Sequence, residues 1–281
     1  MKGCVLILGT AGLLAAGSPE LERARNLYNL TYFDQSLRIL EAIPAKDAAV
    51  YGLMGRDYYM QGDYKRSTEA MEKAVAAEPG DAEYALWLGR AYGRRAESAS
   101  LFTAPGYATK ARQYLERAAE LDPRNIEALA DLFDYYLEAP GFLGGGEDKA
   151  QRTADQIAQL SPAEGYLAKA KLAEKRNEYS AAEAHLRSAV EAAPQQIGKL
   201  IELARFLVKQ GRVQEADQNL ARAEKIAPGS PSLMIAEADI YIRTGRKREA
   251  REILQRYLSA RLTPEDPPRS EALRLLRQAG S

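Results

Sequence analysis

Histidine and cysteine are almost absent from this chain of 281 residues, which contains one of each, His185 and Cys4. A single histidine cannot build a Ser-His-Asp triad or a histidine-based zinc site. The charged residues around His185 indicate a solvated surface position. We therefore expect a protein that is not an enzyme and that uses no cofactor and no metal ion.

Net charge is also absent, because 39 Lys and Arg residues are balanced by 39 Asp and Glu residues. A strong excess of either sign would suggest a polyelectrolyte partner, so neither nucleic acid nor an anionic membrane is an expected partner. Apolar residues make up 46% of the chain and charged residues 28%, which is the composition of a soluble folded protein. Any electrostatic function has to be local.

A long apolar run is missing as well. The run from Val5 to Ala16 has about 12 residues, whereas a membrane-spanning helix needs roughly 20. Lys2 precedes the run and the small residues Ala15 to Gly17 follow it, which is the pattern of a cleaved secretory signal. We predict that residues 1–17 are removed, that the mature chain starts near Ser18 without any cysteine, and that it is exported to the periplasm or secreted. The alternative is an uncleaved, buried N-terminal segment.

What the sequence does contain is an internal repeat. Segments 48–81, 163–196 and 197–230 align with one another, and each has 34 residues. Apolar residues follow helical spacing on both sides of a turn such as Gln61-Gly62-Asp63. Three features recur: a small eighth residue (Gly55, Gly89, Ala170, Ala204, Ala238), a small twentieth residue (Ser67, Ala111, Ala150, Ala182, Ala216, Ala250) and a proline near the end (Pro79, Pro123, Pro162, Pro194, Pro228).

This pattern resembles the tetratricopeptide repeat (TPR). The matching signature residues are Tyr51, Gly55, Tyr58, Gly62, Tyr64, Ala74 and Pro79 in the second unit, and Leu88, Gly89, Tyr92, Ala111, Leu115, Ala118 and Pro123 in the third. The resemblance implies an all-α, right-handed solenoid of about seven helix-turn-helix units, like that of exported bacterial TPR proteins. We place the units at 18–47, 48–81, 82–125, 126–162, 163–196, 197–230 and 231–263. A capping helix over 264–281 is expected to cover the last core with Leu273, Leu275 and Leu276.

Two units have lengthened turns. Segment 138–150 contains Gly144 to Gly146 and suggests a phosphate loop, but a P-loop requires Lys and then Ser or Thr after its second framing glycine. Glu147 and Asp148 stand there instead, so we interpret the glycines as turn residues with positive φ. An insertion of about ten residues lengthens the same turn of unit three, over 93–111. We expect both turns to protrude from one edge, where they either pack together through Leu101, Phe102, Phe142 and Leu143 or form a lobe for partner binding or self-association.

The resemblance also implies that the first helix of each unit lines a concave groove. The ninth and thirteenth places of the units then form a mostly basic stripe, with an acidic break at Asp131, Asp134 and Glu138 in unit four. The clamp that some family members use for a peptide terminus needs asparagine in the sixth place, which these units lack. We predict as partner-binding residues Arg56, Tyr59, Trp87, Arg90, Arg94, Lys171, Lys175, Arg205 and Lys209.

The predicted function is therefore a protein–protein interaction scaffold that binds an acidic protein or peptide segment in this groove. Three alternatives remain open at this point. The stripe is ordinary solvated charge, or it binds a glycan or another polyanion at the cell envelope, or the long turns of units three and four carry the binding site instead.

Overall fold

The computed structural model describes residues 18–280, which form fifteen α-helices and one short 3-10 helix without any β-strand. The predicted signal segment lies outside the described residues. The helices of units one to four are α1 (Pro19–Asn29), α2 (Phe33–Ala42), α3 (Ala48–Met60), α4 (Tyr64–Ala77), α5 (Ala82–Ser98), α6 (Ala104–Leu121), α7 (Ile126–Glu138), η1 (Gly141–Leu143) and α8 (Glu147–Leu160). The remaining helices are α9 (Pro162–Lys175), α10 (Tyr179–Ala192), α11 (Ile197–Lys209), α12 (Val213–Ile226), α13 (Pro231–Arg243), α14 (Lys247–Ser259) and α15 (Arg269–Gly280).

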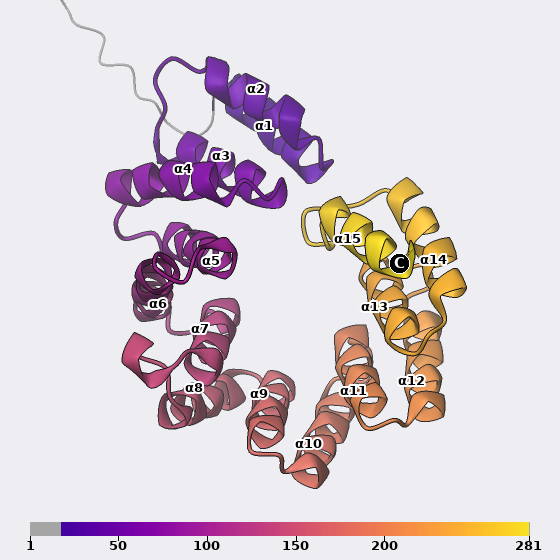
Figure 1. Ribbon diagram of the computed structural model, residues 1–281. Coiled ribbons are helices and arrows are strands. Elements are labelled where there is room, and N and C mark those ends of the chain that lie inside the picture. The colour runs from indigo at the N-terminus through magenta and orange to yellow at the C-terminus, as the bar shows by residue number, and fades with distance from the viewer. Residues whose placement is uncertain (1–17, 281) are drawn as a thin grey trace, which may run out of the picture.

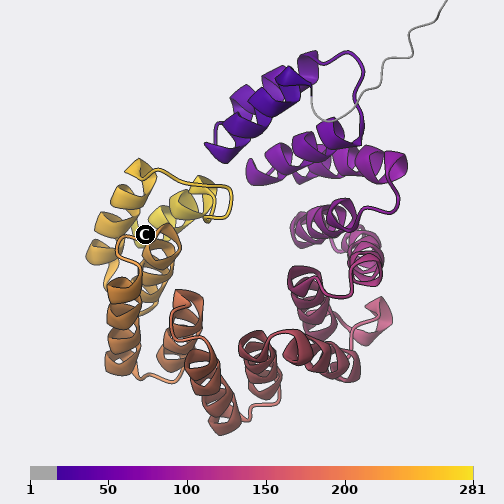
Figure 2. The same ribbon diagram turned by 180° about the vertical axis from the view of Figure 1, so that it is seen from behind.

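The helices are arranged as a solenoid that curls around an open centre (Figure 1). Within each predicted unit two consecutive helices pack against each other, α1 with α2 and so on to α13 with α14. From α5 to α14 the first helix of each unit lies toward the centre and the second lies outside. The reverse view shows the same curl, with the C-terminal helices returning toward the first units (Figure 2). The first helices therefore line the inner, concave side.

Helix starts and turns follow local sequence rules. Asp47, Asp63, Asp81 and Asn125 each precede a helix, and a side-chain oxygen of each accepts a hydrogen bond from a backbone N–H in the first turn, at 2.9 to 3.0 Å. The turns that follow α1, α3, α9, α11 and α13 each contain one residue with φ between 60° and 80°, a conformation that ends a helix sharply. These residues are Thr31, Gly62, Asn177, Gly211 and Gly245.

Small residues allow the two helices of a unit to cross closely. A Cβ atom on Gly55 would come within 2.6 Å of the Met71 side chain, and one on Gly89 within 2.9 Å of Leu115. In unit two the Ser67 hydroxyl donates a 2.8 Å hydrogen bond to the Gly55 carbonyl oxygen across the same crossing. The small residues at the eighth and twentieth places are thus required by packing.

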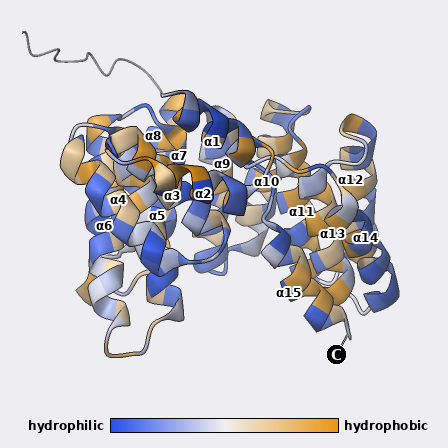
Figure 3. Cartoon of the chain, turned by 90° about the horizontal axis from the view of Figure 1, so that it is seen from above, coloured by the Kyte–Doolittle hydropathy of each residue, from blue (hydrophilic) through white to orange (hydrophobic). Residues whose placement is uncertain are grey.

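Most helices have an apolar and a polar face, and Figure 3 shows hydrophobic and hydrophilic residues mixed along the helices. The apolar residues pack between neighbouring helices, where Leu40, Met71, Tyr92, Phe133 and Phe206 are almost completely buried. The core therefore runs along the solenoid as a continuous chain of clusters, and each unit depends on its neighbours for burial.

The insertion in unit three is helical, which corrects the long turn predicted over 93–111. Helix α5 has 17 residues and α6 has 18, so residues 99–103 alone connect them. The Arg95 guanidinium lies over the Tyr107 ring, 4.1 Å from its centroid, and donates a 2.6 Å hydrogen bond to the Tyr107 hydroxyl. This contact ties the two extensions together. Residues 93–98 contain no proline, so nothing in them stops α5 where the other first helices end.

The glycine loop of unit four is a turn whose hydrogen bonds are satisfied internally. Gly144 and Gly146 have φ of 87° and 151°, and a Cβ atom on Gly145 would lie 1.8 Å from the Ala139 carbonyl oxygen. The backbone N–H groups of all three glycines donate to carbonyl oxygens of residues 136–141. Lys149 donates a 2.8 Å hydrogen bond to the Gly144 carbonyl oxygen. The donors that would hold a phosphate are therefore already used.

The apolar residues at the tips of units three and four do not pack on one another. Leu101, Phe102 and Phe142 are 90%, 96% and 82% exposed, which contradicts the expected mutual packing. Leu143 is half-buried, and its carbonyl oxygen accepts a hydrogen bond from the Tyr135 hydroxyl. The connection of unit three is short and η1 rests against α6, so the two tips remain separate.

Helix α15 covers the end of the solenoid by packing on α13 and α14. Leu275 is buried in this contact and Leu276 packs against it, but Leu273 is 46% exposed and does not contribute as predicted. The Tyr257 hydroxyl, fully buried, donates to the Pro267 carbonyl oxygen and holds the segment that precedes α15. None of the helices between residues 18 and 280 has the length and apolar character of a membrane span.

Candidate partner-binding site

Four of the predicted partner-binding residues meet around one indole ring in units two and three. The guanidinium carbon atoms of Arg56 and Arg90 lie 5.4 and 5.2 Å from the centroid of the Trp87 ring. The Tyr59 ring meets the same indole edge-on at 5.3 Å. Arg56 and Tyr59 belong to α3, and Trp87 and Arg90 to α5, so the inner helices of two units build this Arg–Trp cluster.

Arg94 extends the Arg–Trp cluster by one helical turn. Its guanidinium carbon lies 5.3 Å from the centroid of the Tyr64 ring, and Tyr64 in turn packs edge-on against Tyr59 at 5.4 Å. The sequence did not single out Tyr64 as a site residue, although it stands at a signature position of the repeat. Its place directly after the turn of unit two brings it beside the first helix of unit three.

Both arginines that flank Trp87 are held by carboxylates of the next unit. Arg56 pairs with Glu83 at 2.6 Å, and Arg90 pairs with Asp131 at 2.5 Å and with Glu127 at 3.1 Å. Burial opposes the charge of Arg90, but the two carboxylates outweigh burial and raise the pKa of Arg90. Burial also raises the pKa of Asp131, which Arg90 partly offsets.

The predicted residues of units five and six also lie in ion pairs, without an aromatic cluster like that around Trp87. The pairs are Lys171 with Asp134 at 2.6 Å, Lys175 with Glu138 at 3.0 Å, Lys209 with Glu174 at 2.8 Å and Arg205 with Glu202 at 2.6 Å. All but the last join the first helices of adjacent units. We call these contacts, together with those of Arg56 and Arg90, the ion-pair ladder.

The acidic residues of unit four form part of the ion-pair ladder, so their predicted role in attracting a basic ligand residue is revised. Asp131 neutralises Arg90 of unit three, while Asp134 and Glu138 neutralise the two lysines of unit five. These carboxylates therefore connect neighbouring units and are not free to attract a basic residue of a ligand. The stripe is basic by residue type but largely charge-compensated by its neighbours.

Two cavities lie along the concave side. The smaller has a volume of about 350 Å³ and is lined by Arg205 and Lys209 from unit six together with Glu271 and Arg274 from α15. The larger, of about 980 Å³, is lined by the Arg–Trp cluster residues Arg56, Trp87 and Arg90. The predicted site residues are thus divided between two places, and Tyr59, Arg94, Lys171 and Lys175 line neither cavity.

The larger cavity includes residues that the sequence did not identify. Tyr28 and Asn29 contribute from the end of α1, and Pro264 and Glu265 contribute from the segment between α14 and α15. Burial raises the pKa of Tyr28 to about 12, Arg56 acts in the opposite direction, and Asp57 and Glu265 add to the rise. The C-terminal segment therefore lies close enough to unit one for the charge of Glu265 to act on Tyr28. The repeat pattern does not predict this proximity.

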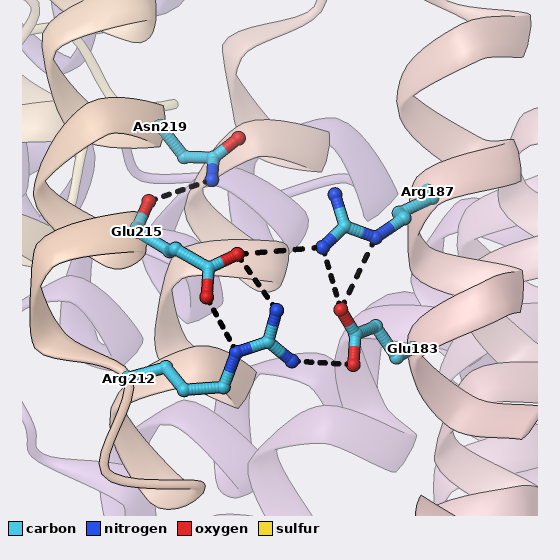
Figure 4. A network of polar contacts seen from close by, with 5 residues as sticks. All are labelled: Glu183, Arg187, Arg212, Glu215 and Asn219. Atoms are coloured by element: carbon cyan, nitrogen blue, oxygen red, sulfur yellow. Dashed lines mark hydrogen bonds and ion pairs between the residues drawn. The ribbon is translucent and has the colours of Figure 1, made fainter. Parts of the chain in front are cut away.

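The outer surface carries a different kind of charge cluster, shown in Figure 4. Arg212 pairs with Glu183 and Glu215, both at 2.6 Å, and Arg187 pairs with Glu183 at 2.6 Å. The Asn219 amide donates to the Glu215 carbonyl oxygen at 2.8 Å. The hydrogen bond from Arg212 is the largest effect on Glu183 and lowers its pKa. Two arginines and two glutamates satisfy one another here, so this network joins α10 to α12 and offers no free charge.

His185 packs against an aromatic ring. His185 is half-buried and stacks on Tyr166 at 6.2 Å, so it is less solvated than its sequence neighbours suggested. In the part of the chain that the structure describes, no three His, Cys, Asp or Glu side chains gather as a metal-binding group.

The comparisons with known proteins point to one family. Models of the tetratricopeptide repeat match residues 53–126, 163–196 and 207–279. No curated protein is similar enough in sequence to count as a relative.

Solved structures of TPR proteins have a similar fold. A thermophilic TPR protein from Thermus thermophilus aligns with a TM-score of 0.54 at 23% identity, over 67% of this chain and 97% of its own. A tetratricopeptide repeat protein from Parabacteroides merdae aligns at 0.59 and 15% identity, over 93% and 98%. The C-terminal part of a TPR repeat-containing protein from Cytophaga hutchinsonii aligns at 0.50 and 15%, over 91% and 99%. At these identities the likeness concerns the fold alone.

Proposed function

Because this chain belongs to the tetratricopeptide repeat family, we propose that it is a non-enzymatic scaffold that binds a segment of another protein on its concave side. TPR proteins generally mediate protein–protein interactions. The observation that supports a specific site is the Arg–Trp cluster, which lines the cavity of about 980 Å³. Tryptophan, tyrosine and arginine are the residue types that contribute most to binding energy at protein interfaces.

An acidic partner segment fits this site by exchange of ion pairs. Glu83 and Glu127, which hold Arg56 and Arg90, are themselves mostly exposed. Exposed pairs contribute roughly 0.2–1 kcal/mol, so a partner carboxylate can displace them at little cost. Arg56, released in this way, can form a bidentate pair with the incoming carboxylate. Arg90, in contrast, stays paired with Asp131 and can turn only its second contact, now with Glu127, to the partner.

The ion-pair ladder gives less support to a glycan or polyanion partner. A polyanion binds through many uncompensated cations, and its affinity falls steeply with salt. Here a polyanion would have to displace a carboxylate partner from every cation of the stripe, whereas a short segment has to displace only those beside Trp87. A segment that makes a few specific contacts around Trp87 therefore suits the site better than a uniformly charged polymer.

We also propose that the protein acts after export. The support is the sequence pattern of residues 1–17, in which Lys2, an apolar run and a small-residue site occur in order. Intact-mass measurement of the protein from an envelope fraction tests this proposal. A mass that begins near Ser18 supports export, and an uncleaved mass in the cytoplasm would remove the proposal without affecting the groove.

Site-specific cross-linking tests the groove itself. A photoreactive amino acid at Tyr59 reports on the Arg–Trp cluster, one at Phe102 reports on the exposed tip of unit three, and one at Ala184 on the outer helix α10 is the control. We expect a protein partner to be captured from position 59, to be lost on Trp87→Ala, and not to be captured from position 184. Thermal unfolding of Trp87→Ala checks that the solenoid still folds.

The exposed tips are the second candidate, favoured by the 90%, 96% and 82% exposure of Leu101, Phe102 and Phe142. Exposed aromatic and leucine side chains on protruding connections are candidates for a binding site or a self-association site. Capture from position 102, independent of Trp87, would move the site from the groove to the tips. Capture of a second copy of the chain from that position would indicate self-association.

A further inference from the structure

The two ends of the solenoid share one cavity. Pro264 and Glu265 line the cavity of about 980 Å³ together with Tyr28, Trp87 and Arg90, which stand more than 170 positions earlier in the chain. In Figure 1 the segment that leads into α15 turns back toward the first three helices. The curl of the solenoid therefore brings a non-repeat segment into the wall of the cavity that the Arg–Trp cluster also lines.

The position of this segment is fixed by its own contacts. The backbone N–H and the hydroxyl of Thr263 both donate to Asp266, at 2.8 and 3.0 Å. Leu262 is buried against the core of unit seven, and the Tyr257 hydroxyl donates to the Pro267 carbonyl oxygen. Glu265 is thus presented by a turn that is anchored on both sides.

The acidic residues around the cavity differ in whether the carboxylate has a polar partner within the protein. Glu83 and Glu127 pair with Arg56 and Arg90. Asp81 and Asp122 accept backbone N–H groups in the turns that precede α5 and α7. Among residues 18–280 the Glu265 carboxylate has no ion pair and no hydrogen bond.

One cation that lines the cavity also lacks an ion pair. The Arg124 side chain, in the turn before α7, lines the cavity without an ion pair to any described residue. Among the charged side chains that line the cavity, Glu265 is the carboxylate without any described polar partner, and Arg124 is the cation without an ion pair. A segment with an acidic and a basic side chain can pair with both of these groups.

We infer that Glu265 is a specificity-determining residue of the proposed partner site, and that it selects segments in which a lysine or arginine accompanies the acidic residue. This inference rests on the proposed function. The acidic side chain would be attracted by Arg124 and by the arginines beside Trp87, and the basic one by Glu265. A purely acidic segment would meet repulsion from Glu265, which is how an interface rejects a near-match.

Selection from a random dodecapeptide library displayed on phage tests the inference. The wild-type protein is compared with E265Q, and with E69Q as a matched control that removes the same charge from an exposed position on α4. We expect the wild type and E69Q to enrich peptides that contain both an acidic and a basic residue, and E265Q to lose the enrichment of the basic one. In fluorescence anisotropy, replacing that basic residue by alanine should weaken binding to the wild type roughly two- to fivefold and leave binding to E265Q unchanged.

The outcomes separate this inference from the proposed function. Peptides whose binding is abolished by Trp87→Ala but whose composition is the same for wild type and E265Q overturn the inference alone. Peptides that bind regardless of Trp87→Ala place the site elsewhere and overturn the proposed groove site together with the inference. A library from which the wild type enriches nothing counts against both.

Discussion

Units two and five present the same repeat positions to the same side of the solenoid, yet the side chains there have different surroundings. The ninth place holds Arg56 in unit two and Lys171 in unit five. Arg56 lies over Trp87 as well as pairing with Glu83, whereas Lys171 pairs with Asp134 and lies only at the limit of contact with Phe133, 6.0 Å from its ring centroid. A cation at a groove position is therefore not enough to make a site, because what the next unit places beside it decides whether it belongs to an aromatic cluster or to a simple ion pair.

The tenth place differs even more. Asp57 is fully buried in unit two, where units five and six bury Leu172 and Phe206. The Ser36 hydroxyl donates to one Asp57 oxygen at 2.7 Å, and the other oxygen has no partner in the described residues. Burial raises the pKa of Asp57 to about 8, with Ser36 acting in the opposite direction. Unit two thus carries an energetic cost that units five and six avoid.

The largest expected effect comes from removing this difference with Asp57→Asn. The folded protein holds the carboxyl protonated up to about pH 8, while the unfolded chain loses the proton near its ordinary pKa of 3.8. The stability that the protonated form contributes is therefore present below about pH 4 and is lost as the pH rises to about 8. At pH 8, Asp57→Asn should raise the free energy of unfolding by roughly 2–4 kcal/mol and so unfold at a higher urea concentration than the wild type. The free energy of unfolding of the variant should also depend less on pH.

Urea unfolding at several values from pH 5 to pH 9 measures this. Asp155→Asn, at an exposed position on α8, is the control for loss of one carboxylate. If Asp57→Asn and Asp155→Asn show the same pH dependence as the wild type, Asp57 is ionised in the folded protein and the contrast between units two and five is wrong.

A smaller effect should distinguish Arg90 from Arg205, which share the ninth place in units three and six. Arg90→Gln leaves Asp131 partly buried without its partner, and we expect a loss of about 1–3 kcal/mol in the free energy of unfolding. Arg205→Gln removes an exposed pair with Glu202, within the same helix, and should change stability by less than about 0.5 kcal/mol. Chemical unfolding of both variants at pH 7 compares them directly. Equal losses would mean that the two units are energetically equivalent.

The sequence predicted the features that recur in every unit, which are the helix pairs and the groove positions. It did not predict the contacts that side chains make with neighbouring units. Spacing located the helix pairs, and Arg56, Tyr59, Trp87 and Arg90 do converge, because the repeat fixes which helix face lies inside. Their ion-pair partners were not predicted, since Glu83 stands 27 residues after Arg56 and its pairing depends on side-chain geometry.

Two further features of the structure were not predicted from the sequence, for different reasons. The insertion in unit three became helix because residues 93–98 can continue α5 as well as they can form a turn. Glu265 belongs to no repeat, and its approach to Tyr28 results from the accumulated curvature of seven units, which no single unit encodes.

Replacing the turn glycines of units two and six should lower the free energy of unfolding by the same amount. Gly62 in unit two and Gly211 in unit six have φ of 80° and 75°, and a Cβ atom would meet nothing within 4 Å at either position. Alanine there is strained by the backbone alone, so Gly62→Ala and Gly211→Ala should each cost about 1 kcal/mol. Thermal or urea unfolding measures both losses. A large difference between them would show that the turns, and not only the groove positions, differ between the two regions.

The smallest expected effect on folding concerns the exposed tip of unit three, which the other compared units lack. Phe102 is 96% exposed and contacts too little of the protein to contribute to its stability. Phe102→Ser should therefore leave the free energy of unfolding within about 0.5 kcal/mol of the wild type. Sedimentation velocity over a range of protein concentrations is the informative measurement, because an exposed aromatic side chain can mediate association without contributing to the fold. If the wild type forms dimers that Phe102→Ser lacks, the tip is a self-association site; if both are monomers and Phe102→Ser still captures the partner of the groove, units two and three bind through the Arg–Trp cluster without the tip.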